Sequence, residues 1–182
     1  MLDPPAFNNV SSLEQSTILA AGAWNFILNA DLSKYEQDEF GFITVPQTDI
    51  DVYITKLFGE GLQYEHQSIG DAEYSFTYNA EDKTYNIASA QLYYSFVPRV
   101  TQITKDKNMV DLTVEYVAPT MLLNKSHSDA NPVPAKVMKY TLEESNSGNY
   151  KIISVSIISS GGNSSQSSAS NSSASSSESS AS

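Results

Sequence analysis

The spacing of apolar residues changes once along this chain, from helical periodicity before residue 60 to alternation after residue 70. Residues 13–28 and 50–58 place apolar or small side chains three and four positions apart, as amphipathic helices do. From residue 74 onward, aromatic and β-branched residues alternate with polar ones, which is typical of half-buried strands. Helices followed by hairpins predict an α+β domain. We expect a curved antiparallel meander of about five to six strands, covered on one face by two or three N-terminal helices.

Local signals predict where the two helices begin and end. Ser12 and Gln15 fit a capping box for the first helix, and Thr48 is the expected N-cap of the second. Asp49 would then lie in the first turn, where the helix dipole favours an anion. Gly59 follows the apolar stripe at the position of a helix-ending glycine.

The alternating segments predict the strands. They are expected at 74–78, 84–87, 92–103, 110–116, 137–142 and 150–158. Pro98 interrupts the third segment and indicates a bulge or an edge position, because proline donates no ladder hydrogen bond. Between the helices, the residues before Pro46 suggest one more short extended piece. Asp111 and Glu115 lie opposite an apolar face, so a solvated outer face explains them better than a carboxylate site does.

Composition divides the chain into three parts. Residues 1–10 form an irregular lead-in, and residues 11–158 form a single α+β domain. Residues 159–182 are almost entirely Ser, Ala, Asn and Gly, with Glu178 as their one charge. Such a segment buries too little apolar surface to offset its conformational entropy, so it is interpreted as a disordered linker or stalk.

Charge and residue types exclude several functions. The chain has no cysteine, which excludes disulfides and thiolate metal sites, and no apolar run long enough to span a membrane. Ten basic against 21 acidic residues give a net charge of −11, which disfavours nucleic acids. His66 and His127 both fall in polar segments and are interpreted as solvated loop residues. We therefore expect no metal, no cofactor and no identifiable catalytic residue.

The order of elements resembles the nuclear transport factor 2-like, or cystatin-like, superfamily. Residues 45–52, continuing to Phe58 and Gly59, are similar to small extracytoplasmic domains of Gram-positive bacteria, as are residues 96–100 and 149–153. Many of those domains belong to membrane-anchored lipoproteins of unknown function. The resemblance covers roughly residues 12–158 and implies a cone-shaped hollow between sheet and helices. In that superfamily the hollow is sometimes an isomerase or dehydratase site, with an acid–base pair of Asp, His or Tyr, and sometimes a packed core or partner surface.

Eleven tyrosines, seven phenylalanines and one tryptophan allow two interpretations. They form a sheet core with hydroxyl groups at its rim, or they line a ligand surface. If the cone of the resembled superfamily binds a ligand, the expected lining residues are Trp24, Tyr53, Tyr94, Tyr116 and Tyr140. Trp24 is better explained as a core residue.

Three functional hypotheses remain. The favoured one is a non-enzymatic extracytoplasmic domain that binds a protein, peptide or glycan through its open sheet face or the 119–134 loop. The alternative is a small-molecule binder or isomerase/dehydratase-like enzyme that uses the cone. The third is a surface spacer or dimerisation module, with the sheet face as the surface for a homodimer. The Ser-rich stalk, the acidity and the absence of cysteine favour an extracytoplasmic or cell-surface location, with a cytoplasmic one as the alternative.

Overall fold

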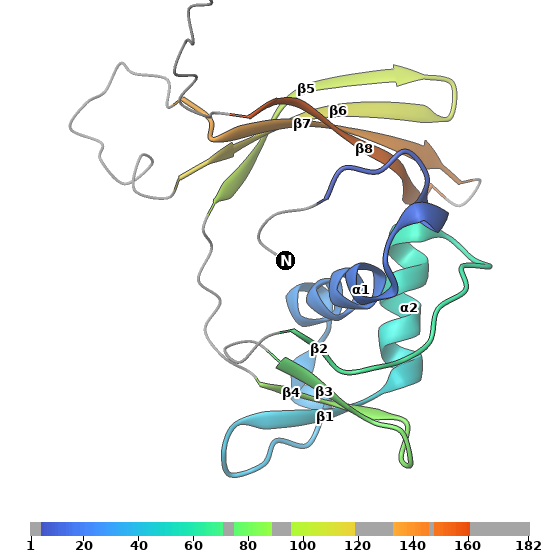
Figure 1. Ribbon diagram of the computed structural model, residues 1–182, viewed down its shortest axis with the longest axis vertical. Helices are drawn as coiled ribbons and strands as arrows, with labels where there is room; N and C mark the ends of the chain where they lie inside the picture. The colour runs from blue at the N-terminus through green and yellow to red at the C-terminus, as the bar shows by residue number, and fades with distance from the viewer. Residues whose placement is uncertain (1–4, 71–74, 89–95, 119–132, 146–147, 161–182) are drawn as a thin grey trace, which may run out of the picture.

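The computed structural model describes residues 5–70, 75–88, 96–118, 133–145 and 148–160. Within these residues the chain forms two α-helices and eight strands, which confirms the predicted α+β class. The helices lie between two antiparallel sheets (Figure 1). The elements are η1 (Val10–Ser12), α1 (Gln15–Asn29), η2 (Leu32–Lys34), β1 (Phe42–Pro46), α2 (Gln47–Phe58), β2 (Ile69–Gly70), β3 (Ser75–Asn79), β4 (Thr84–Ala88), β5 (Val97–Asp106), β6 (Met109–Val117), β7 (Lys136–Glu144) and β8 (Tyr150–Ser160).

The strands are divided between two sheets, in place of the single predicted sheet of five or six strands. The small sheet has the order β1-β4-β3-β2, and the large sheet is the simple meander β5-β6-β7-β8. The extended piece between the helices becomes β1 and pairs along its whole length with β4, so β4 has strands on both sides. Strand pairing joins residues far apart in the chain, and alternation alone does not show which strands are neighbours.

The strand bounds agree with the predicted ones to within two residues at β3, β4, β6, β7 and β8. The predicted segment 92–103 is only partly described, and β5 begins at Val97. Pro98 lies inside this edge strand, in agreement with the predicted edge position, and a bulge follows between Val100 and Gln102. At the other margin of the sheet, Phe7 pairs with Val155 of β8, so part of the predicted lead-in is fixed.

The helix ends differ from the capping predictions at both N-termini. The Ser12–Gln15 capping box is wrong, because Ser12 belongs to η1 and α1 has no side-chain cap. The Gln15 side chain instead accepts a hydrogen bond from the backbone N–H of Glu65, at 3.2 Å. The second helix begins one residue before Thr48, at Gln47. Its C-terminus is as predicted, because Gly59 adopts φ +84° and ends the helix.

The main hydrophobic core lies between the two helices and the small sheet. Its fully buried side chains include Leu19 and Phe26 of α1, Ile50 of α2 and Tyr85 of β4, each 0 % exposed. The helices approach most closely at Gly22, where an added Cβ would lie 2.2 Å from Ile54 Cγ1. This core holds α1, α2 and the small sheet together as one unit.

The large sheet has one apolar and one polar face. Val110, Val114, Met138 and Val155 are buried on the apolar face. On the opposite face, Lys139 pairs with Asp111 and Arg99 with Glu115, at 2.9 and 2.5 Å. These two carboxylates are therefore engaged in separate ion pairs and do not form a carboxylate pair.

Neither described helix has the length and apolar character needed to cross a lipid bilayer.

Candidate functional site

A groove of about 830 Å³ lies between the C-terminal end of α2 and the end of the large sheet where β6, β7 and β8 meet. Gly59 lies where these two parts meet, because a Cβ at this residue would lie 3.0 Å from Lys151 Cδ. The groove is lined by Thr55, Lys56, Gly59, Glu60, Asn108, Glu143, Glu144, Ser145, Asn149, Tyr150 and Lys151.

Three of the five charged side chains that line the groove are engaged in ion pairs. Lys151 contacts Glu143 at 2.7 Å, and Lys105 beside the groove contacts Glu144 at 2.5 Å. The hydrogen bond between Lys105 and Glu144 lowers the pKa of the Glu144 carboxyl and raises the pKa of the Lys105 ammonium. Both groups are therefore ionised at neutral pH, and they neutralise each other.

Neutral polar groups and one aromatic ring complete the groove. Tyr150 is 44 % exposed, and its hydroxyl donates a hydrogen bond to Glu144 Oε1 at 3.2 Å. The amide of Asn108 donates to Glu143 Oε1 at 3.2 Å, so the two adjacent glutamates are both held in place. A ring fixed at its hydroxyl end presents its face as a rigid contact surface.

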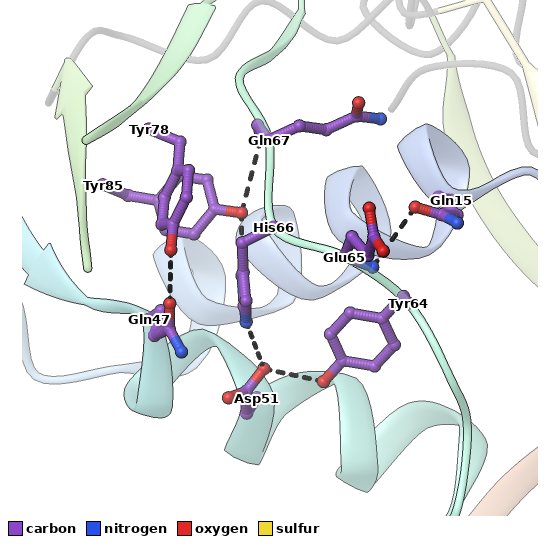
Figure 2. A network of polar contacts seen from close by, with 9 residues as sticks. All are labelled: Gln15, Gln47, Asp51, Tyr64, Glu65, His66, Gln67, Tyr78 and Tyr85. Atoms are coloured by element: carbon purple, nitrogen blue, oxygen red, sulfur yellow. Dashed lines mark hydrogen bonds and ion pairs between the residues drawn. The ribbon is translucent and has the colours of Figure 1, made fainter. Parts of the chain in front are cut away.

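A second polar cluster surrounds His66 (Figure 2). His66 Nε2 lies 3.1 Å from Asp51 Oδ1, and Nδ1 lies 3.0 Å from the Tyr85 hydroxyl. The Tyr64 hydroxyl donates to the same Asp51 oxygen at 2.7 Å. A carboxylate beside Nε2 favours a hydrogen on that nitrogen. The Tyr85 hydroxyl lies within hydrogen-bond distance of both His66 Nδ1 and the Gln67 carbonyl oxygen, at 3.0 and 3.4 Å.

The His66 side chain is only 12 % exposed, so the predicted solvated loop histidine is wrong. Its ring stacks on Tyr78 at a centroid distance of 5.4 Å and meets Tyr64 and Tyr85 edge-on. Tyr78 is fixed in turn by a 2.5 Å hydrogen bond to the Gln47 side chain. The second predicted loop histidine, His127, lies outside the described residues.

The sequence did contain a signal for the burial of His66. Leu62, Tyr64 and His66 are spaced by two in an extended segment and are partly buried, whereas the residues between them are exposed. Their side chains turn toward α2 and the small sheet because an extended chain alternates its faces. The polar neighbours Glu65 and Gln67 concealed this pattern.

An Asp–His–Tyr chain has the chemical groups needed to move a proton, but its members are engaged with one another. The Asp51 carboxylate contacts His66 Nε2 and accepts a hydrogen bond from the Tyr64 hydroxyl. The Tyr85 hydroxyl lies between His66 Nδ1 and the Gln67 carbonyl oxygen. Within the described part of the chain, no buried side-chain polar atom lacks a hydrogen-bond partner. None of these residues lines the groove. The cluster therefore acts first as a polar seam that fixes the 62–67 segment on α2.

Three tyrosines in or against the helix core, Tyr35, Tyr64 and Tyr85, predict a loss of stability at alkaline pH. Burial, together with a 2.7 Å hydrogen bond to Asp49, raises the pKa of Tyr35 to about 12, and burial also raises the pKa of Tyr64 and Tyr85. Tyrosine in an unfolded chain ionises near pH 10, at about its reference pKa. The folded state therefore retains these protons longer, and the free energy of unfolding falls as the pH rises from about 10 to 12. The fall is at most about 1.4 kcal/mol per pH unit for each such group, and it is smaller for Tyr35, which solvent partly screens.

Urea unfolding at stepped pH, with phenolate absorbance recorded in parallel, measures this effect. Tyr35→Phe should reduce the slope by about one proton. Complete ionisation of all tyrosines near pH 10 in a folded protein would contradict the prediction.

The predicted ligand residues do not converge on one pocket. Trp24 packs edge-on against Phe76 at 5.3 Å, and Tyr53 packs edge-on against Phe26 at 5.4 Å, so both belong to the margin of the helix core. Tyr116 and Tyr140 join their hydroxyl groups across β6 and β7. Tyr94 lies outside the described residues. The groove instead presents Tyr150, which the sequence analysis had assigned only to a strand.

The described residues contain no group of three His, Cys, Asp or Glu side chains placed to hold a metal ion. Comparisons with family models, with curated proteins and with solved structures give no match to this chain. The groove and the His66 seam are therefore interpreted from their own geometry.

Proposed function

We propose that this chain is a non-enzymatic binding domain that takes a neutral, hydroxyl-rich ligand, a glycan, in the groove between α2 and the large sheet. The observation that carries the proposal is an 830 Å³ groove with the partly exposed Tyr150 ring beside internally paired charges. Concave sites with a few fixed polar groups are the usual places for ligands.

The paired charges favour a neutral ligand over a charged one. A cationic or anionic peptide would have to compete with partners already engaged in pairs such as Lys151–Glu143. Sugar hydroxyls both donate and accept hydrogen bonds, so they can join carboxylates, amides and ammonium groups without breaking those pairs. The apolar face of a sugar ring also suits the flat surface of Tyr150.

The location and the wider relationship are part of this proposal. We infer an extracytoplasmic or cell-surface domain carried on the Ser-rich segment 159–182, which is supported by that composition and by the lack of cysteine. Membership of the nuclear transport factor 2-like superfamily is proposed on the order helix, short strand, helix and antiparallel meander. The first four strands form a separate small sheet, which differs from the single curved sheet expected from the resemblance.

Replacement of the groove tyrosine tests the glycan proposal. The intact chain is screened on an array of neutral and amino-sugar oligosaccharides, and the best ligand is titrated by calorimetry. Tyr150→Ala should weaken binding at least about tenfold, because one buried aromatic contact contributes on the order of 1.5 kcal/mol or more. Phe40→Ala is the matched control, since Phe40 is also an exposed aromatic residue, at 77 %, but does not line the groove. Equal affinity of both variants, or no binding to any oligosaccharide, would refute the proposal.

The alternative is a small-molecule enzyme or binder, and the Asp51–His66–Tyr85 chain is the observation that favours it. An acid–base pair of this kind is the chemistry that the isomerase and dehydratase branches of the resembled superfamily use. In that case substitution of His66 would abolish ligand turnover, whereas substitution of Tyr150 would leave it unchanged. The low exposure of His66 and its full set of partners make this the weaker proposal.

A further inference from the structure

Strand β5 forms one margin of the large sheet (Figure 1). It pairs with β6 on one side, and no described strand pairs with its other side. Nine of its ten residues are exposed. A long exposed edge strand presents backbone donors and acceptors to which another strand can add.

Apolar side chains lead up to this edge on one face of the sheet. The strand registers connect them into two rows across all four strands, namely Val100–Val114–Met138–Ile157 and Ile103–Leu112–Tyr140–Val155. Met138 in the middle is 0 % exposed, whereas Val100 and Ile103 at the edge are 51 % and 67 % exposed. Both rows therefore end in solvent at β5.

We propose that β5 pairs with β5 of a second copy of this chain, antiparallel and about a two-fold axis, with Val100 opposite Ile103 of the second copy. The bulge makes β5 self-complementary in this register. Val100 and Ile103 are three residues apart, so in a regular strand their side chains would point to opposite faces. The bulge inserts Thr101 as an extra residue with no opposite residue on β6, and both side chains therefore point to the apolar face. Each apolar row of one copy then meets the other row of its partner, and the two large sheets continue into one sheet of eight strands. Such an isologous contact is the commonest way for identical chains to associate.

The distribution of charge supports self-association through this half of the molecule. Residues 1–96 hold the whole acidic excess, with 14 acidic and three basic side chains, whereas residues 97–182 carry seven of each. Two copies that meet at β5 bring their electrically balanced halves together. Their acidic halves contact the large sheet at β8, the margin opposite β5, so repulsion between them is screened across the width of the joined sheet.

Strand β5 contains a proline, a lysine and a bulge, and the proposed register accommodates all three. Proline, lysine and bulges at an edge each restrict which strand can add. The proposed register places Pro98 opposite Lys105 of the second copy at both ends of the contact and leaves the apolar pairs at its centre. One strand pair is smaller than a standard interface of about 1,600 Å², so the dimer should dissociate on dilution.

Sedimentation velocity of the full chain over a concentration series tests the association. The protein should form a dimer, and Ile103→Lys should weaken it at least about tenfold, because the two-fold axis places two lysines on the apolar contact. Ile158→Lys is the matched control, since Ile158 is 56 % exposed in β8, away from β5. A monomer at every concentration, or equal weakening by both variants, would overturn the proposal. A monomer that instead binds extended peptides of other sequence through β5 would overturn it as well.

Cysteine cross-linking tests the register, and the chain has no cysteine of its own. Directly opposed residues in antiparallel strands have Cβ atoms about 4.5–5.5 Å apart, which a disulfide spans with little movement. A mixture of Val100→Cys and Ile103→Cys chains should therefore form a mixed dimer faster than either variant alone forms its own. Faster self-linking of one variant would overturn the proposed register.

Discussion

Phe26→Ala should lower the free energy of unfolding by about 3–5 kcal/mol, the usual cost of removing a fully buried aromatic ring. Phe26 is 0 % exposed and packs edge-on against Tyr35 and Tyr53, at 5.2 and 5.4 Å. The substitution therefore removes apolar burial and two aromatic contacts at the centre of the helix core. Since domains of this size are stable by about 5–15 kcal/mol, the variant should be close to unfolding.

Urea unfolding followed by circular dichroism measures this loss. Phe40→Ala is the matched control, because Phe40 is 77 % exposed and its replacement should change stability by less than about 0.5 kcal/mol. Where Phe26→Ala yields too little folded protein, Phe26→Leu gives a smaller measurable loss because it retains most of the volume. Similar stabilities for the Phe26 and Phe40 variants would show that the core does not lie where the structure places it.

Gly22→Ala should destabilise the protein by about 1–3 kcal/mol, although the same change in an open helix would stabilise it by about 0.5–1 kcal/mol. The reason is the close approach of α1 and α2, since the new Cβ would lie 2.2 Å from Ile54 Cγ1. The methyl group can be accepted only if the buried Ile54 side chain or one of the helices shifts. A loss of stability, in place of the gain expected in an open helix, would therefore indicate that the two helices are in close contact at Gly22.

A double-mutant cycle isolates this clash. In an Ile54→Ala background the methyl group added at position 22 has room, so Gly22→Ala should become neutral or stabilising. Ile54 is 1 % exposed, and its truncation is costly, so the cycle is best measured in a stabilising osmolyte. Ser16→Ala on the exposed side of α1 provides the baseline. A destabilisation by Gly22→Ala that persists unchanged without the Ile54 side chain would contradict the proposed helix contact.

Features that depend on neighbouring residues were predicted well. The stripe of α2 and its end at Gly59 followed from spacing and from the backbone freedom of glycine. The strands β6, β7 and β8 followed from alternation, and Pro98 indicated an edge. In each case the information lies within a few residues of the element itself.

The predictions that failed involve contacts between distant parts of the chain. Gln15 was assigned to a local capping box, but its side chain bonds to Glu65, 50 residues away. His66 was assigned to solvent because its neighbours are polar, but it is enclosed by Tyr78, Tyr85 and the Asp51 carboxylate. A local pattern carries no information about a partner that only folding brings close.

The candidate groove shows the same dependence on tertiary contacts. Its lining residues come from the end of α2, from the turn after β5 and from the ends of β7 and β8, and none of them forms a recognisable motif. Gly59 looked like a helix terminator and is one, but its second role, the close approach to Lys151, is visible only in the assembled molecule. Tyr150 looked like the first residue of a strand and becomes the exposed ring of the groove.

The amino-acid sequence by itself determined the α+β class, the helical stripes, most strand bounds and the location of the net negative charge in the first 96 residues. These properties depend on short-range periodicity and composition. Tertiary structure alone decided that the strands divide into two sheets, that His66 is enclosed, and that β5 is left at an edge. The physical reason is that pairing and burial are choices among distant partners, and the free energy that selects among them arises only when those partners pack together.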